Sequence, residues 1–129
     1  MDLWDRLAGK YGVELIERDG TFIARKDSLE TTSKIVGNKV VVSMNTKPYS
    51  IILQPAEDGV VNTIYLGKLP VMQVRYAIQP QGFADKIICI AKGLTLLVTL
   101  LILLLHPLLL LVDIAVLLIG PLIVLLNCL

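Results

Sequence analysis

The chain has 129 residues, of which 55% are hydrophobic, and its formal net charge is +1. This length allows one small domain, and the balanced charge excludes a polybasic nucleic-acid-binding protein and an acidic tail. Of all the Lys, Arg, Asp and Glu residues, only Lys92 and Asp113 lie beyond Lys86. The sequence therefore predicts two parts, a polar domain over residues 1–82 and a hydrophobic segment over residues 83–129.

The N-terminal stretch favours a short amphipathic helix. Leu3, Trp4 and Leu7 recur at helical spacing, and an acidic residue such as Asp2 is typical of a first helical turn. We expect the helix to cover Asp2 to Lys10 and to end near Gly9 and Gly12.

Beyond this helix the hydrophobic period changes to two, which is typical of strands. Asp19-Gly20 lies between two alternating stretches and predicts a β-hairpin. Residues 27–34 are polar and lack a strand pattern, so we expect a loop or one helical turn there. The alternating stretches and the turn residues around them predict strands over residues 13–18, 21–26, 39–44, 49–54, 60–66 and 71–78.

One face of these strands should be buried, since Tyr49, Ile51 and Leu53 share one face of their strand, and in 71–78 the apolar residues Met72, Val74, Tyr76 and Ile78 share the face opposite Gln73 and Arg75. The short connections imply an antiparallel sheet with one apolar face, over which the N-terminal helix could pack. The predicted fold class is α+β: a small antiparallel β-sheet domain with one N-terminal helix, followed by a C-terminal transmembrane helical hairpin.

The hydrophobic segment is long enough to cross a bilayer twice. A spanning helix needs about 20 apolar residues, and His106-Pro107 divides the segment near its midpoint. Because proline disrupts a helix interior, we expect helices over residues 83–105 and 108–126 with a turn at His106-Pro107. The alternatives are a re-entrant wedge, which Gly120-Pro121 would favour, and one long kinked helix.

The cations of this segment predict its orientation. Lys86 and Lys92 flank the first helix, where we interpret them as interfacial anchors, and no Lys or Arg follows. The positive-inside tendency then predicts an integral, two-span membrane protein with the polar domain and the C-terminus on the cytoplasmic side. Cys89 and Cys128 would lie at similar depth on that side, where reversible palmitoylation is an option and a structural disulfide is not expected.

Four polar residues of the segment are candidates for helix packing or partner contact: Asp113, Thr99, Thr95 and His106. A carboxylate inside an apolar helix costs a few kcal/mol on insertion scales, so Asp113 should face protein or water. Thr99 and Asp113 are equally far from His106, so a hairpin would bring the Thr99 hydroxyl close to Asp113. We interpret His106 as a turn residue, with a proton relay as the alternative.

No motif indicates catalysis, because the glycines lack phosphate-binding spacing, no serine lies in GxSxG, and residues 1–82 contain no histidine. We expect a non-enzymatic protein without cofactor or metal, an accessory or assembly subunit of a larger membrane complex. Its expected partners are the lipid bilayer and larger integral membrane subunits. The alternatives are a homo-oligomeric pore-forming or proton-conducting protein of the viroporin or holin kind, and a membrane-remodelling hairpin wedge.

Overall fold

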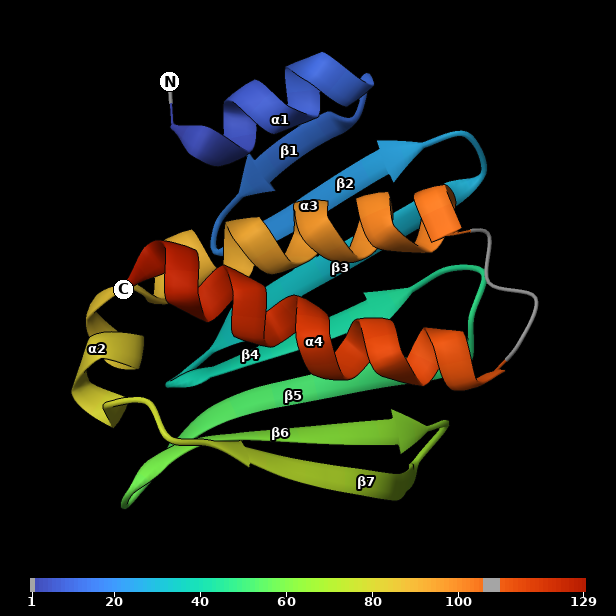
Figure 1. The fold of residues 1–129 in the computed structure, drawn as a ribbon. Helices are drawn as coiled ribbons and strands as arrows, with labels where there is room; N and C mark the ends of the chain where they lie inside the picture. The colour runs from blue at the N-terminus through green and yellow to red at the C-terminus, as the bar shows by residue number, and fades with distance from the viewer. Residues whose placement is uncertain (1, 106–109) are drawn as a thin grey trace.

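The structure, a computed structural model, describes residues 2–105 and 110–129. In this part of the chain, strands form a seven-stranded antiparallel sheet in which each strand pairs with the next one along the sequence (Figure 1). The strands are β1 (Glu14–Arg18), β2 (Thr21–Lys26), β3 (Leu29–Val36), β4 (Lys39–Met44), β5 (Tyr49–Ala56), β6 (Gly59–Leu66) and β7 (Leu69–Tyr76).

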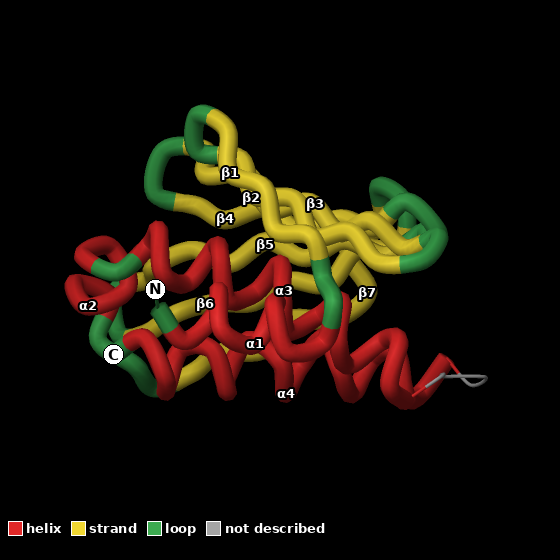
Figure 2. The backbone as a smooth tube through the Cα atoms, turned by 90° about the horizontal axis from the view of Figure 1, so that it is seen from above, coloured by secondary structure: helices red, strands yellow, loops and turns green. Residues whose placement is uncertain are grey.

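Helices lie on one face of this sheet and make the molecule two-layered (Figure 2). Helix α1 (Leu3–Tyr11) precedes the sheet, and α2 (Pro80–Asp85), α3 (Ile87–Leu105) and α4 (Leu110–Cys128) follow it. α3 contacts β2, β3 and β4 on one side and packs against α4 on another. The fold is therefore α+β, with two long apolar C-terminal helices packed as a pair.

The N-terminal helix forms as predicted because both of its ends are capped. The Asp2 carboxylate accepts a hydrogen bond from the Asp5 N–H at 2.9 Å, which satisfies one free donor of the first turn. Gly12 ends the helix in the left-handed conformation, at φ +70°. The predicted hairpin is also confirmed, since Asp19 and Gly20 both have positive φ, 50° and 77°.

The loop expected over residues 27–34 is wrong, because β3 runs through it. The inward-facing side chains of β3 are Leu29, Thr31 and Ser33, all buried. Two of these three carry hydroxyl groups, so the strand shows no apolar alternation in the sequence. β3 is held instead by pairing with a neighbour on each side, β2 and β4.

The cover of the sheet also differs from the expectation. The sequence placed the N-terminal helix over the apolar face, whereas α3 lies across β2, β3 and β4 and α1 packs beside it on β1. The apolar face is well defined, and its fully buried side chains include Phe22, Val40, Val42, Ile51, Leu53 and Ile64. α3 therefore contributes to the core of the sheet domain.

The boundaries of the two long helices are shifted from those predicted. Phe83 belongs to α2, and Lys86 separates α2 from α3. α4 continues through Pro121 to Cys128. The expected turn at His106-Pro107 lies outside the described residues.

By length and composition, the stretches Ile87–Leu105 and Leu111–Cys128 could each cross a membrane. A buried core helix of a soluble protein can meet the same criteria. The contacts of each face of the helix pair therefore distinguish a membrane helix from a core helix.

Candidate functional site

The inner surface of α3 and α4, which faces the sheet, holds the buried polar side chains of Thr95, Thr99 and Asp113. The hydroxyl groups of Thr95 and Ser33 hydrogen-bond at 2.6 Å, and both residues are fully buried. Thr99 is also buried, and its hydroxyl donates to the carbonyl of Thr95 at 2.7 Å. Thr95 thus joins α3 to β3.

Asp113 pairs with a residue of the sheet rather than with the neighbouring helix. It lies in the first turn of α4 and is 4% exposed, and its Oδ2 is 3.3 Å from Nζ of Lys47 in the β4–β5 turn. Its Oδ1 has no hydrogen-bond partner among the described residues. The predicted bond from Thr99 to Asp113 is therefore wrong, because the Lys47 ammonium takes that place.

A second polar contact joins α4 to β6 and β7. Pro121 has no N–H, so the carbonyl of Leu117, four residues earlier, lacks its helical donor. The fully buried Asn62 supplies one, since its Nδ2 donates to that carbonyl at 2.9 Å. The same Nδ2 donates to the Tyr76 hydroxyl at 3.1 Å, and this hydroxyl donates to the carbonyl of Leu118 at 2.6 Å.

This network also affects the ionisation of Tyr76. Burial raises the pKa of the Tyr76 hydroxyl, and the hydrogen bond from Asn62 lowers it in part, so the net direction is upward. Tyr76 therefore remains a neutral donor to α4 over the physiological pH range.

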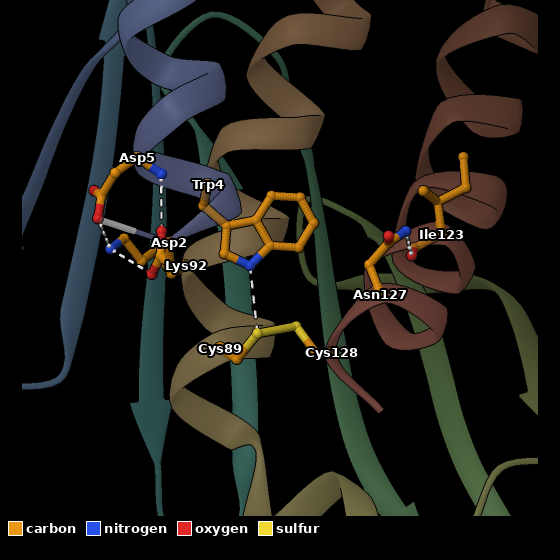
Figure 3. Close-up of a disulfide and its surroundings, with 8 residues drawn as sticks. All are labelled: Asp2, Trp4, Asp5, Cys89, Lys92, Ile123, Asn127 and Cys128. Carbon is orange, nitrogen blue, oxygen red and sulfur yellow. Dashed lines mark hydrogen bonds and ion pairs between the residues drawn. A yellow bond between two sulfur atoms is a disulfide. The ribbon is translucent and has the colours of Figure 1, made fainter.

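At the other end of the pair, α1 is attached to α3 by charge (Figure 3). The Lys92 ammonium lies 3.0 Å from Asp2 and 2.9 Å from Asp5. Burial alone would raise the pKa of Asp2, but the hydrogen bonds from the Asp5 N–H and from Lys92 outweigh it and hold this pKa below its usual 3.8. Lys86, the other predicted anchor, is exposed between α2 and α3.

A disulfide between Cys89 and Cys128 joins the start of α3 to the end of α4, with 6.0 Å between the two Cα atoms (Figure 3). The expectation of unpaired cysteines is therefore wrong, although their predicted similarity in depth is consistent with this short distance. The indole Nε1 of Trp4 donates to Cys89 Sγ at 3.3 Å. α1, α3 and α4 thus meet at one point.

Gly93 permits this close meeting of the three helices. A Cβ atom at Gly93 would lie 2.7 Å from the Trp4 ring and 2.8 Å from Val124. Any larger residue would push α1 or α4 away from α3. The sequence offered a weak signal for Gly93, a single glycine inside an apolar helix, but no sign of its neighbours.

The outer surface of the pair, turned away from the sheet, has the opposite character. Apart from Asn127 in the last turn of α4, every exposed side chain in the described part of α3 and α4 is aliphatic. Between the two helices an apolar groove of about 150 Å³ is lined only by aliphatic side chains, among them Leu101, Val116 and Ile119. We define the outer surface by its largest exposed members: Ile88, Leu104, Leu105, Leu111, Ile119, Ile123 and Leu126.

The described residues offer little for acid–base or metal chemistry. No three His, Cys, Asp or Glu side chains within residues 2–105 and 110–129 lie close enough to hold a metal ion. The candidate His106 lies outside these residues. The polar groups that the structure brings together are those joining the two layers, and sequence reasoning missed Lys47, Asn62 and Tyr76 because their partners are distant in the chain.

Comparisons with protein-family models, with curated proteins and with solved structures found no match to this chain.

Proposed function

We propose that this chain is a non-catalytic membrane protein, held at the membrane by α3 and α4, and that it serves as an accessory subunit of a larger membrane complex. The observation that carries the proposal is the outer surface. Soluble monomers rarely expose large contiguous apolar patches, which are typical of surfaces covered by lipid or by another protein. Leu111, for example, is 76% exposed and Leu126 is 67% exposed.

The distribution of polar groups supports an anchor rather than a pore. A conducting pathway needs a polar lining that continues across the bilayer. Thr95 and Asp113 contact the sheet, at Ser33 and Lys47, and the groove between the helices is apolar. No contact in the described part of the chain favours the pore alternative.

The topology predicted from the sequence, two spans with the polar domain and the C-terminus on the cytoplasmic side, remains one arrangement of this anchor. The length of both helices supports it. The Cys89–Cys128 disulfide argues for an oxidising compartment instead. Both observations are compatible with a membrane anchor, and they differ in the compartment in which they place the sheet domain.

The accessory role rests on the free edge of β7. Among the described strands, β7 pairs only with β6, so its other edge carries unpaired N–H and C=O groups. Leu69, Val71 and Met72 on this strand are 65%, 46% and 39% exposed. An edge of this kind can accept a strand from a partner, from Val71 onward, since Pro70 lacks an N–H.

Affinity purification of the tagged chain from native membranes in a gentle detergent, followed by mass spectrometry, tests this function. We expect larger integral subunits to co-purify with the wild type and to be lost from Val71→Glu, which stays in the membrane fraction. Lys39→Glu, an exposed change at the start of β4, is the matched control and should retain them. A wild-type chain found in the soluble fraction would contradict the membrane function, and a homo-oligomer alone would contradict the accessory role.

A further inference from the structure

We propose that the membrane-bound protein keeps its sheet on α3 and α4 and lies on one leaflet, with the outer surface in the hydrocarbon of that leaflet. This inference rests on the proposed membrane function and specifies how the anchor is seated. Its central consequence is that neither helix crosses the bilayer.

Crossing would separate the polar groups of α4 from their partners in the sheet domain. Asp113 would leave Lys47. The carbonyl of Leu117 would lose Asn62, the donor that replaces the missing N–H of Pro121. Hydrocarbon offers no replacement donors or acceptors, so a spanning α4 would carry an unpaired carboxylate and an unpaired carbonyl.

The sheet also depends on the two helices for its core. Phe22, Val42 and Ile51 have at most 1% of their surface exposed, and they lie on the face that the helices cover. A spanning pair would leave much of this apolar face to water, because the main remaining contacts with the sheet are those of α1 with β1 and of the short helix α2 with β5 and β6. The sheet and the pair therefore form one folded unit.

Lipid acyl chains are the occupant that suits the outer surface. The groove at Val116 and Ile119 is lined by aliphatic side chains only, so it offers no hydrogen bond to a headgroup or to a polar protein rim. A pair of helices that is polar on one side and apolar on the other suits the interface between bilayer and water. Amphipathic helices lie there with their apolar side about 5–10 Å below the headgroups.

A covalent lock between the two layers tests this arrangement. The Oγ atoms of Ser33 and Thr95 are 2.6 Å apart, so the double variant Ser33→Cys/Thr95→Cys places two thiols within bonding reach. The full-length variant is oxidised, its additional disulfide is verified by mass spectrometry, and binding to phosphatidylcholine–phosphatidylglycerol vesicles is measured by flotation. Ser33→Cys alone is the control for the substitution.

We expect the locked protein and the control to float with the vesicles to the same extent. Loss of flotation from the locked protein alone, at least tenfold, would overturn the one-leaflet arrangement and leave the membrane function intact. Failure of the wild type to float would contradict the membrane function, and with it this inference. A wild-type dimer that buries the outer surface and persists in the presence of vesicles would identify a second copy, not lipid, as the occupant.

If the additional disulfide disturbs folding, a second measurement tests whether α3 crosses the bilayer. Leu104 is 63% exposed near the end of α3, so Leu104→Cys introduces a thiol without changing the core. A membrane-impermeant thiol reagent trapped inside the vesicles should leave this cysteine unlabelled when the protein is added from outside. Labelling from the inside would show that α3 crosses and would overturn the inference.

Discussion

The side-chain amide of Asn62 donates to the backbone carbonyl of Leu117, 2.9 Å away and 55 residues later in the chain. This carbonyl is free because Pro121 occupies the position whose N–H would normally bond to it. A proline that would weaken an isolated helix is thereby accommodated by a polar residue of the sheet. The pairing shows that α4 and β6 are adapted to each other.

The adaptation predicts that Asn62 and Pro121 are energetically coupled. Asn62→Leu should lower the free energy of unfolding by about 1–3 kcal/mol, since it leaves the Leu117 carbonyl buried without a donor. In a Pro121→Ala background the restored N–H can bond to that carbonyl, so the same change should cost about 1 kcal/mol less. Denaturant unfolding of the four proteins in matched detergent measures the coupling. Equal costs in both backgrounds would contradict this interpretation.

The disulfide should stabilise the fold and quench the indole of Trp4, the only tryptophan of the chain. The bond closes a loop between Cys89 and Cys128, 39 residues apart, so its reduction should lower the stability by about 2–4 kcal/mol. Removal of the disulfide from contact with the ring should also increase the tryptophan fluorescence.

Fluorescence before and after treatment with a dithiol reductant measures this effect. Cys89→Ser/Cys128→Ser is the control, and its emission should be insensitive to the reductant. Unchanged wild-type emission, in protein whose two thiols are shown to be free, would refute the predicted contact between Trp4 and the disulfide.

The sequence was sufficient where local signals decide the structure. Asp2 and Gly12 delimit α1, and Asp19-Gly20 forms the turn of the β1–β2 hairpin. The alternation around Ile51 identifies the buried face of β5. Such features depend on neighbours a few residues apart, so they can be interpreted from a single chain.

The sequence was insufficient where a residue acts through a distant partner. Ser33 is a polar residue in a polar stretch until Thr95, 62 residues later, is placed against it. Asp113 indicated that a partner exists, but nothing local identified Lys47. The apolar composition of α3 is equally compatible with a membrane span and with a core helix, because both environments favour aliphatic side chains.

Asp113 and Lys47 should stabilise the fold as a pair. Asp113→Leu leaves the Lys47 ammonium, whose side chain is 27% exposed, without its counter-charge, so we expect a loss of about 1–3 kcal/mol. The double variant Lys47→Met/Asp113→Leu should recover much of that loss. A double-mutant cycle in chemical denaturation measures the interaction energy between Lys47 and Asp113. If Asp113→Leu is as stable as the wild type but loses its co-purifying subunits, Asp113 is a partner contact instead.

The attachment of α1 should weaken in acid. The pKa of Asp2 is lower in the folded chain than its usual 3.8, so the unfolded chain takes up the proton first. The stabilising contribution is therefore fully present above about pH 4 and is lost as the pH falls through the folded pKa. Asp2→Asn keeps a good helix cap but removes the charge next to Lys92.

Thermal unfolding of the wild type and of Asp2→Asn, at neutral pH and at about pH 2, measures this contribution. The wild type should be more stable at neutral pH, and the difference should shrink in acid. If wild type and Asp2→Asn differ in stability by the same amount at both pH values, the charge of Asp2 has no part in holding α1.

In the arrangement that we propose, α4 meets lipid along its length without crossing the bilayer. This arrangement is tested most directly by the depth of spin labels at Leu111, Ile119 and Leu126, which are 76%, 54% and 67% exposed on the outer surface. The first and last are separated by about 22 Å along the helix. With the protein on vesicles, paramagnetic relaxation by oxygen and by a nickel chelate gives each depth. We predict the same shallow depth for all three, about 5–10 Å below the headgroups. A label at Ile119 near the bilayer centre, with Leu111 and Leu126 near opposite surfaces, would contradict it.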